Sequence, residues 1–429
     1  MRVSFYTLGC KVNQNETGAL EQLFLRRGYT LAADGEAADV YVVNSCTVTA
    51  GGDKKSRQWL RRAKRQNPGA VTVMAGCYPQ AFPEEAAQLE EADVVVGNVG
   101  RAAMLEDIQK ALDSGERVVD IRAHEKGERF EELPMENFEG HTRAFIKVQD
   151  GCDRRCAYCV IPRARGASRS RSEESVVKEL AALAAAGYKE VVLSGINLPS
   201  YGKDTGTDLV SLIEAAAKVE GIERIRLGSL EPDLLSDEAI ARMAAVKELC
   251  PQFHLSLQSG CTATLRRMRR VYTAGEYARV VEKLRAAFGG FASFTTDVIV
   301  GFPGETEDEF AESLAFVCAQ KFLKVHVFPY SRRAGTPAAK MPGQHTNEEK
   351  EARSARALAV ASALEEAYQR DMVGKEYPVL FEEMHGEMAV GHAPNYVLVH
   401  VAAEIPRNTL ATVRVTGLCP GGVVGEIAG

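Results

Sequence analysis

The stretch Gln149-Asp-Gly-Cys-Asp-Arg-Arg-Cys-Ala-Tyr-Cys159 brings three thiols together directly after a predicted strand, Ala144–Val148. The spacing Cys152-x3-Cys156-x2-Cys159 lets all three thiolates reach one metal centre, and soft thiolates select iron–sulfur clusters or zinc. A structural zinc site normally has four ligands, but the next cysteine is Cys250 and the next histidine is His254. Three ligands with an open position predict a site that binds substrate or cofactor. A zinc site completed by a distant residue is the alternative.

A second set of cysteines follows three predicted strands of the N-terminal region. Cys10, Cys46 and Cys77 end the stretches Phe5-Tyr-Thr-Leu-Gly-Cys10, Val42-Val-Asn-Ser-Cys46 and Val73-Met-Ala-Gly-Cys77. Their separations match the ~30-residue period of a strand–helix–strand unit. Because the carboxyl ends of parallel strands lie along one sheet edge, we expect the three thiols to meet there. This predicts a second three-thiolate site; three separate buried cysteines are the alternative.

Alternating strand and helix signals surround both sets. In residues 1–115 they indicate a doubly wound parallel sheet covered by helices, and an acid-rich linker is predicted at 116–140. In residues 141–370, six strand–helix steps predict a partial (β/α)6 barrel, followed by a helix at Asn347–Val373. The N-terminal strands are predicted at Val3–Leu8, Val40–Val43, Val71–Met74 and Val94–Val96, and helices at Glu16–Arg27 and Lys54–Gln66. The later strands are predicted at Ala144–Val148, Val191–Ser194, Arg224–Gly228, Phe253–Gln258, Thr296–Gly301 and Lys324–Phe328, and the helices at Glu173–Ala186, Leu209–Val219, Asp237–Leu249, Ala274–Phe288 and Glu307–Gln320.

Residues 371–429 change to short strands separated by Gly, Pro and Asn, which predicts a small closed barrel of the OB-like kind. The predicted strands are Tyr377–Glu383, Met388–Gly391, Tyr396–Val401, Ala411–Val415 and Val423–Ile427. The predicted fold class is therefore α/β: an N-terminal doubly wound parallel sheet, a central partial barrel and a C-terminal small β-barrel.

Composition excludes several classes of protein. The chain has 429 residues, with 52 Lys+Arg against 58 Asp+Glu and a net charge of −6. No apolar run approaches the ~18–20 residues of a membrane span, and Met1–Cys10 is too polar for a signal peptide. We therefore expect a cytoplasmic protein without membrane association, whose ten cysteines are thiols or ligands rather than disulfides. The absence of a GxSxG elbow, a P-loop and a strand-linked GxGxxG argues against hydrolases, NTPases and Rossmann dehydrogenases.

Basic residues gather in three stretches despite the acidic total. Lys54–Arg65 carries seven bases around Trp59, residues 143–171 hold eight bases against two acids, and Leu265–Arg270 adds a third group. One such run can be a solvated helix face, but three groups, one beside the cysteine loop, favour an RNA footprint. The predicted RNA-contacting residues are Lys54, Lys55, Arg57, Arg61, Arg62, Arg163, Arg165, Arg169 and Arg171.

The C-terminal segment does not share this basic character. Residues 374–429 contain three Lys/Arg and six Glu. This segment is expected either to contact RNA through groups such as Asn395 and Tyr396 or to pack mainly on the barrel.

Cys152-x3-Cys156-x2-Cys159 after a first barrel strand resembles the radical S-adenosylmethionine (SAM) enzymes, in which such cysteines hold a [4Fe–4S] cluster that binds SAM. Together with Cys10, Cys46, Cys77 and the five-stranded tail, essentially the whole chain resembles the methylthiotransferases. Their domain order is a cluster-bearing domain, a radical SAM barrel and an RNA-binding TRAM domain. The resemblance implies two [4Fe–4S] clusters, an auxiliary one on Cys10, Cys46 and Cys77 and a SAM cluster on Cys152, Cys156 and Cys159.

Local sequence separates the branches of that family. The isopentenyladenosine branch typically has Gln-Met-Asn after its first cysteine and the ribosomal-protein branch has Pro-Lys-Asn, whereas this chain has Lys11-Val-Asn13. It is similar to the branch that adds a methylthio group to C2 of N6-threonylcarbamoyladenosine at position 37 of tRNA. This similarity rests on the sequence motifs Thr7-Leu-Gly-Cys-Lys-Val-Asn13, Val43-Asn-Ser-Cys-Thr-Val-Thr49, Arg226-Leu-Gly-Ser-Leu-Glu-Pro232, His254-Leu-Ser-Leu-Gln-Ser-Gly-Cys261 and Phe328-Pro-Tyr-Ser-Arg-Arg333.

The resemblance also implies positions around SAM. Tyr158 is expected near the adenine, and Ser194-Gly-Ile-Asn197 stands where many radical SAM enzymes have Gly-Gly-Glu. Val298–Glu305 loosely matches a fifth-strand element. His254 and His326 are expected to be core or pocket histidines rather than metal ligands. The predicted cofactor-binding residues are Tyr158, Ser194, Gly195, Asn197, Gln258, Ile299 and Phe328, and no catalytic residue is predicted beyond the six cysteines.

The chemistry accounts for two clusters. The C2–H of adenine has no acidic proton, so a radical carried by a cofactor is the plausible route. The resemblance implies two SAM molecules per turnover, one for the radical and one for the methyl group, with tRNA as substrate and a flavodoxin or ferredoxin as electron donor. Alternatives are a methylthiotransferase for isopentenyladenosine or for a ribosomal-protein aspartate, and a non-catalytic metal-binding RNA-binding protein.

Overall fold

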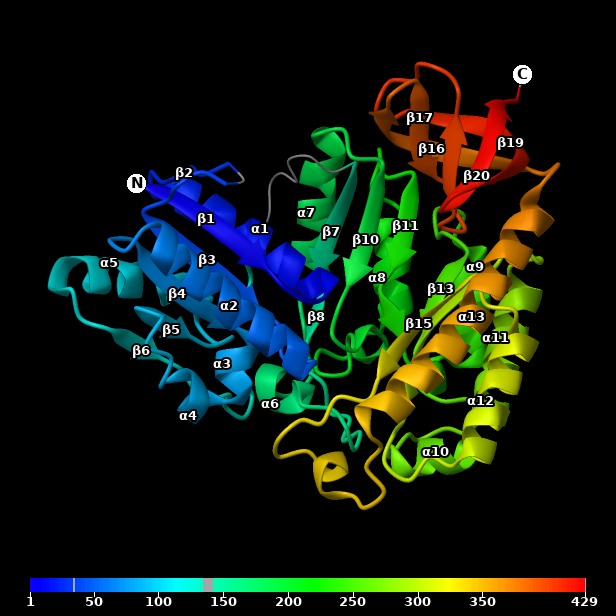
Figure 1. The fold of residues 1–429 in the computed structure, drawn as a ribbon. Helices are drawn as coiled ribbons and strands as arrows, with labels where there is room; N and C mark the ends of the chain where they lie inside the picture. Colours follow the sequence, from blue (N-terminus) through cyan, green and yellow to red (C-terminus); the bar gives the residue numbers. More distant parts are fainter. Residues whose placement is uncertain (34, 134–141, 429) are drawn as a thin grey trace.

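The computed structural model describes residues 1–33, 35–133 and 142–428. Figure 1 shows three regions in chain order, namely an N-terminal sheet with helices, a central curved sheet, and a small β-barrel at the C-terminus. The predicted fold class is confirmed. Within the described ranges, no helix is both long enough and apolar enough to span a lipid bilayer.

The N-terminal region is a six-stranded parallel sheet with strand order β2-β1-β3-β4-β5-β6. Apolar side chains pack on both of its faces, because alternate residues such as Val42 and Val43 belong to separate hydrophobic clusters. Strand β6 lies inside the predicted linker, so the sheet continues past residue 115. The strands are β1 Arg2–Thr7, β2 Thr30–Leu31, β3 Val40–Ser45, β4 Val71–Gly76, β5 Val94–Val96 and β6 Val118–Asp120, and the helices are α1 Lys11–Arg26, α2 Ala50–Gln66, α3 Cys77–Ala81, α4 Pro83–Ala86, the 3₁₀ turn Arg101–Ala103 and α5 Met104–Ser114.

The central region is an open barrel of parallel strands in two sheets, β11-β10-β7 and β12-β13-β14-β15. One face packs on the covering helices through residues such as Ile146, Leu193 and Ile225. The other face, on which Phe145, Val192 and Arg226 share one row, lines the lumen. The strands are β7 Arg143–Lys147, β10 Glu190–Ser194, β11 Arg224–Leu227, β12 Ser229–Leu230, β13 Gln252–Leu255, β14 Ser293–Val300 and β15 Lys324–Pro329, and the covering helices are α7 Glu173–Ala185, α8 Leu209–Ala216, α9 Asp237–Ala245, α11 Ala274–Ala287 and α12 Glu307–Gln320.

Shorter elements surround the cysteine loop at the carboxyl ends of these strands. They are the antiparallel pair of β8 Gln149–Asp150 with β9 Arg169–Ser170, helices α6 Ile161–Arg165 and α10 Thr262–Arg267, and 3₁₀ turns at Leu198–Ser200, Pro232–Leu234 and Pro337–Lys340. Capping boxes begin three of the longer helices, at Thr273, Thr306 and Thr346, which satisfies their first amide groups.

The long helix α13, Asn347–Met372, leads to a closed five-stranded barrel with strand order β16-β17-β18-β20-β19. In Figure 1 this barrel lies beyond the amino ends of the central strands, on the side away from α6 and α10. Its strands are β16 Glu376–His385, β17 Met388–His392, β18 Leu398–Val401, β19 Leu410–Cys419 and β20 Gly422–Ile427.

Candidate active site at two cysteine sets

The loop of Cys152, Cys156 and Cys159 follows β8 and is fixed by backbone hydrogen bonds. The Cys152 N–H donates to the Gly166 carbonyl at 3.0 Å, and the Cys159 N–H donates to the Cys156 carbonyl at 3.1 Å. Gly151 has φ 72°, and a Cβ there would lie 1.9 Å from the Ala167 carbonyl oxygen. Only glycine therefore fits the turn that leads into the first cysteine.

Two polar side chains contact the sulfurs of this loop. Arg270 Nη1 donates to Cys156 Sγ at 3.2 Å, and Asn197 Nδ2 donates to Cys152 Sγ at 3.7 Å. Asn197 Oδ1 is buried and has no hydrogen-bond partner in the described parts of the chain. A buried carbonyl oxygen without a donor beside a ligand cysteine suits a cofactor that brings an amino group, which SAM does.

The second set meets at one edge of the N-terminal sheet. Cys10 follows β1, Cys46 follows β3, and Cys77 begins α3 directly after β4. Because the chain leaves β1 for β2 and then returns to β3, Cys10 and Cys46 lie across the point where the strand order reverses, which is where such sheets bind ligands. Gly9 has φ 116°, and a Cβ on it would lie 2.8 Å from the Cβ of Cys46. The edge is thus a tight cradle for the three sulfurs.

Each of these sulfurs has a polar neighbour. Arg165 Nε donates to Cys77 Sγ at 3.2 Å, and the Val48 N–H donates to Cys46 Sγ at 3.5 Å. Cys10 Sγ lies 3.5 Å from Asn13 Oδ1, and the Asn13 amide donates to the carbonyls of Leu8 and Ser45. Asn13 therefore joins the turn after β1 to the end of β3. Sequence reasoning assigned no role to Asn13 or to the Arg165–Cys77 contact.

The width of both sets favours clusters over a single ion. In tetrahedral zinc sites the Zn–S bond of ~2.3 Å places sulfurs about 3.8 Å apart. In neither cysteine set do the three sulfurs all lie within 4.8 Å of one another. In the described ranges, the only three ligand atoms that lie so close together belong to His254, Asp297 and His326. Burial, reinforced by neighbouring Cys77, raises the pKa of Cys46 to about 12, and burial raises that of Cys159 to about 12. Bound iron would reverse this and hold the thiolates.

The residues predicted to contact SAM lie in the cysteine loop and at or near the carboxyl ends of the barrel strands. Tyr158 is half-buried in the loop and packs edge-on against Phe302, with ring centroids 6.4 Å apart. The Ser194 hydroxyl donates to the Ile146 carbonyl at 3.0 Å, and a Cβ on Gly195 would lie 2.8 Å from Gln149 Oε1. Gln258 has φ 69°, pairs with Val298 and precedes the loop to α10. Ile299 and Phe328, on β14 and β15, lie on the lumen face, where Phe328 is exposed.

A buried network of charges connects the two cysteine sets. Glu16 on α1 lies 2.7 Å from Lys147 Nζ and 3.0 Å from Arg101 Nη2, and it also pairs with Arg165. Asp150 lies 2.6 Å from Lys147 Nζ. Although burial alone would raise its pKa, the cations Arg101, Arg165 and Lys147 lower the pKa of Glu16 to about 2. The network fixes the N-terminal sheet against the first barrel strand.

This network corrects part of the predicted RNA surface. Arg165 is fully buried, Arg169 hydrogen-bonds the Arg165 carbonyl at 2.7 Å, and Arg171 pairs with Glu179. The prediction that these three arginines contact RNA is wrong, because each is buried and holds the cysteine loop to its neighbours. Arg270, in the third basic stretch, is likewise engaged with Cys156, Glu231 and Tyr272.

The remaining predicted bases lie nearer the surface. Arg163 is exposed and donates to the Ala334 carbonyl at 3.2 Å, while Arg57 is half-buried over the Tyr78 ring. Trp59 is not available for base stacking, because it stacks on Tyr6 with centroids 5.0 Å apart. The exposed bases of α2 from the predicted set are Lys54, Lys55, Arg61 and Arg62.

Two further predicted groups are placed by the structure. His254 Nε2 lies 3.4 Å from Asp297 Oδ2 on the lumen wall, and burial lowers the pKa of neighbouring His326. The ligand atoms of these three residues lie within 4.8 Å of one another, so the expectation that the histidines are not metal ligands stays a prediction. Asn395 is buried, and Tyr396 packs beneath Arg226 at 4.7 Å. The C-terminal barrel therefore directs both residues, predicted as possible RNA contacts, toward the central barrel.

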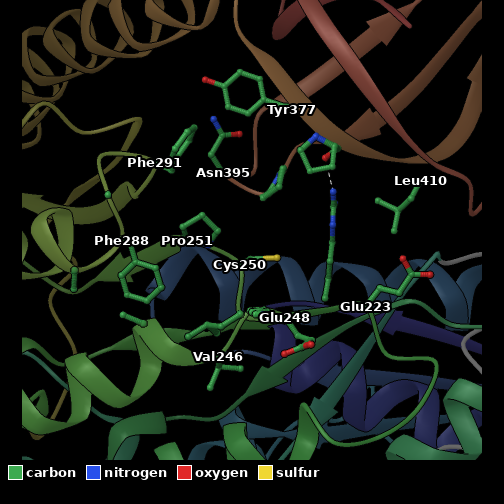
Figure 2. Close-up of a pocket in the computed structure, with 18 of the residues that line it drawn as sticks. Glu223, Val246, Glu248, Cys250, Pro251, Phe288, Phe291, Tyr377, Asn395 and Leu410 are labelled. Atoms are coloured by element: carbon green, nitrogen blue, oxygen red, sulfur yellow. Dashed lines mark hydrogen bonds between the residues drawn. The ribbon is translucent and has the colours of Figure 1, made fainter. Parts of the chain in front are cut away.

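A separate cavity of about 730 Å³ lies between the amino ends of the central strands and the C-terminal barrel. Figure 2 shows its walls, with Phe288, Pro251 and Val246 on the side of the central barrel and Tyr377 and Asn395 on the side of the C-terminal barrel. It is distant from the cysteine loop, because Arg224 begins β11 and Pro251 immediately precedes β13, whereas the loop lies at the carboxyl ends of the strands.

Comparisons with known families agree with this division. Residues 146–317 match the Radical SAM superfamily, and residues 2–97 match the Uncharacterized protein family UPF0004. Among solved structures, the radical S-adenosylmethionine methyltransferase TsrM from Kitasatospora setae has a TM-score of 0.57 at 16% identity, covering 79% of this chain and 76% of that one. The likeness shows a shared fold. The fold and the Cys152–Cys159 loop define a radical SAM enzyme.

Full-length relatives narrow this class. The Threonylcarbamoyladenosine tRNA methylthiotransferase MtaB of Bacillus subtilis is 42% identical, covering 92% of this chain and 89% of the relative. That of Aquifex aeolicus is 43% identical, covering 80% and 83%. A tRNA-2-methylthio-N(6)-dimethylallyladenosine synthase of Pelotomaculum thermopropionicum is 35% identical, covering 87% and 85%. The chain belongs to the radical SAM methylthiotransferase family, whose transferases use [4Fe–4S] clusters and SAM, and the predicted resemblance is confirmed.

Proposed function

We propose that this protein adds a methylthio group to C2 of N6-threonylcarbamoyladenosine at position 37 of tRNA. The observation that carries the proposal is the pair of three-cysteine sites, one in the radical SAM loop and one at the neighbouring sheet edge, joined by the Glu16–Lys147–Arg165 network. Each set has three protein thiolates, which leaves one position of a four-iron cluster open. Substitution of an unactivated C–H bond needs both a radical source and a sulfur carrier.

The residues around each set provide the binding chemistry. Cys152, Cys156 and Cys159 would hold the SAM cluster, and the unpaired Asn197 Oδ1 would accept a hydrogen bond from the SAM amino group. Cys10, Cys46 and Cys77 would hold the auxiliary cluster. When bound, the clusters and SAM supply the electron transfer and radical chemistry. Tyr158, Gln258, Ile299 and Phe328 would enclose SAM and keep water from it.

The choice of threonylcarbamoyladenosine rests on the relatives. Those named for threonylcarbamoyladenosine are 37–43% identical to this chain, against 33–36% for those named for dimethylallyladenosine. The dimethylallyl substrate is the second candidate.

We propose that tRNA approaches over the exposed bases of α2 and over Arg163. Helix α2 begins four residues after Cys46, and its first amide donates to Ser331 Oγ at 3.1 Å, so its amino end lies at the junction of the sheet and the barrel. Phosphates bound there would lie beside both cysteine sets. A cytoplasmic location and an electron donor of the flavodoxin or ferredoxin kind belong to the same proposal.

Anaerobic turnover tests the substrate. The reconstituted protein is given SAM, reductant and one of two tRNAs, carrying threonylcarbamoyladenosine or dimethylallyladenosine at position 37, and the nucleosides are analysed by mass spectrometry. We expect 2-methylthio product from the first tRNA alone. Product from the second tRNA alone would overturn the substrate assignment, and formation of neither product nor 5′-deoxyadenosine would overturn the enzyme class.

A further inference from the structure

Lys11, the residue after Cys10, places an ammonium group in the barrel without an ion-pair partner among the described residues. Its Nζ lies 5.8 Å from the centroid of the Phe145 ring and 5.6 Å from that of the Tyr396 ring. No hydrogen bond or ion pair engages this ammonium within the described ranges. A half-buried lysine whose neighbours are aromatic rings has lost water without gaining a carboxylate, which is costly unless a ligand supplies one.

Phe145 locates this ammonium on the lumen side of β7. Ala144 and Ile146 face the covering helices, so Phe145 and Arg143 face the lumen together with their β10 partners Val192 and Glu190. Tyr396 lies at the end of the lumen nearest the C-terminal barrel, with its ring 4.7 Å from the Arg226 guanidinium. It holds φ 71°, an uncommon conformation for an aromatic residue, and its ring lies 5.2 Å from the Arg143 guanidinium.

The charges around Tyr396 are mainly positive. Four cations, Lys11, Arg143, Arg224 and Arg226, lie at this base of the lumen against two carboxylates, Glu190 and Glu382. Burial alone would raise the pKa of Tyr396, but the charges of Arg143, Lys11 and Arg226 outweigh burial and lower it. The lowered pKa of Tyr396 is thus a consequence of the excess of positive charge around its hydroxyl.

Only two of the four cations keep a hydrogen-bond donor that no described residue engages. Arg226 donates to Glu190 at 2.9 Å and to the Pro394 carbonyl at 2.9 Å, and Arg224 donates to the His392 carbonyl at 3.0 Å. Arg143 reaches Glu382 through Nε at 3.2 Å, but its Nη1 is buried and has no hydrogen-bond partner in the described parts of the chain. Lys11 and the Nη1 of Arg143, both beside the Tyr396 ring, therefore keep donor groups that an anionic ligand could use.

The far wall of the lumen would not take an anion. There Asp297 stands between His254 and His326, and burial lowers the pKa of His326, which favours its neutral form. A negative group entering the lumen is therefore directed to the Lys11 side. The backbone of Lys11 follows Cys10 of the auxiliary set, while its ammonium reaches the Tyr396 ring at the end of the lumen where Arg143 begins β7.

We propose that Lys11 and Arg143 bind the carboxylate of the threonylcarbamoyl group and thereby select this substrate. The inference rests on the function proposed above. Threonylcarbamoyladenosine differs from dimethylallyladenosine in carrying one carboxylate on its N6 substituent, and ammonium with guanidinium is the donor set that suits a carboxylate. An alkyl substituent would leave both cations desolvated and unpaired, which lowers the affinity for dimethylallyladenosine.

The test measures binding without turnover. Three anticodon stem–loop RNAs of one sequence carry threonylcarbamoyladenosine, its carboxamide, or unmodified adenosine at position 37. Anisotropy titrations with the cluster-loaded protein give three dissociation constants. For the native protein we expect the carboxylate RNA to bind roughly tenfold to a hundredfold more tightly than the carboxamide RNA, as a charged hydrogen-bonded pair implies.

Variants assign that preference to residues. Lys11→Met should bring the carboxylate and carboxamide RNAs to nearly equal affinity, while Lys11→Arg should keep most of the preference. Lys178→Met, at an exposed lysine of α7, is the matched control and should leave the preference intact. Iron content and thermal unfolding verify that each variant is loaded and folded, and Arg143→Met provides a second variant if Lys11→Met loses iron.

Two results would contradict the proposal: equal native affinity for the carboxylate and carboxamide RNAs, or an undiminished preference in loaded Lys11→Met. Failure of the proposed function looks different. In that case the native protein would bind the unmodified RNA as tightly as the threonylcarbamoyl RNA and would not methylthiolate threonylcarbamoyladenosine in tRNA.

Discussion

The two cysteine sets provide the same three thiolate donors but differ in how the chain brings these donors together. Cys152, Cys156 and Cys159 lie on one loop, whereas Cys10, Cys46 and Cys77 come from the ends of three strands. Yet each set receives one buried arginine, because Arg270 donates to Cys156 and Arg165 donates to Cys77, both at 3.2 Å. A local loop can form its site almost alone, but the strand-end set depends on the whole sheet and on a residue of the barrel. The auxiliary site should therefore be the more sensitive of the two to changes elsewhere.

The largest expected effect separates the roles of the two sets. Cys156→Ser should abolish both 5′-deoxyadenosine and methylthio product, because the radical depends on the loop cluster. Cys77→Ser should abolish the methylthio product but keep 5′-deoxyadenosine formation. Chromatography of anaerobic reactions measures both products, and Cys419→Ser, outside either set, is the control. Loss of both products in Cys77→Ser with the loop cluster intact would refute independent roles.

Removing the central carboxylate of the interdomain network should have the next largest effect. At pH 7, Glu16→Gln would leave Arg101, Lys147 and Arg165 underneutralised and lower the free energy of unfolding by about 3 kcal/mol or more. Urea denaturation measures this change, and the exposed Glu84→Gln is the control. An unchanged midpoint would show that the network does not stabilise the native protein.

The lowered pKa of Glu16 predicts that the destabilisation caused by Glu16→Gln depends on pH. The pKa of Glu16 is about 2 in the folded protein and ordinarily 4.5, so its stabilisation is fully present above pH 4.5 and is lost as the pH falls toward 2. The difference between native protein and Glu16→Gln should be constant from pH 7 to 5.5 and smaller at pH 3.5. A difference that grows on acidification would contradict the assignment.

The exposed bases of α2 connect the auxiliary side to RNA and should give a smaller effect. Replacing Lys54 and Lys55 with Gln should weaken tRNA binding and reduce the slope of log affinity against log salt by about 1 for each phosphate that the variant no longer binds. The paired control is Lys178→Gln with Arg279→Gln, two exposed bases on covering helices. Equal losses of affinity in both double variants would indicate general charge rather than a footprint.

The smallest expected effect is a change in cluster reduction potential when Arg165 or Arg270, the arginines that donate to cysteine sulfurs, is replaced. Replacing either with lysine keeps the charge but weakens the hydrogen bond to sulfur, and should lower the reduction potential of one cluster only. Arg165→Lys should shift the auxiliary cluster, and Arg270→Lys the loop cluster. Redox titration followed by electron paramagnetic resonance measures both potentials. A shift of both clusters in one variant would mean that the sites are not electronically separate.

The sequence predicted both cysteine sets because each has a local signature, either close spacing or a repeated strand end. It could not predict Arg165 or Arg270 as their partners, since 88 and 114 residues separate these arginines from the cysteines they contact. The same limit explains the error over Arg165, Arg169 and Arg171. A run of bases looks alike in sequence whether it faces solvent or buried carboxylates, and only the packing of α1 against β7 distinguishes the two.

The central claim is that each cysteine set holds its own four-iron cluster. Iron and zinc analysis with Mössbauer spectroscopy of the anaerobically reconstituted protein tests it most directly. We predict about eight irons per chain without zinc, falling to about four in Cys77→Ser and about four in Cys156→Ser, with a different cluster lost in each. Zinc at either set, or about four irons in the native protein, would contradict the account.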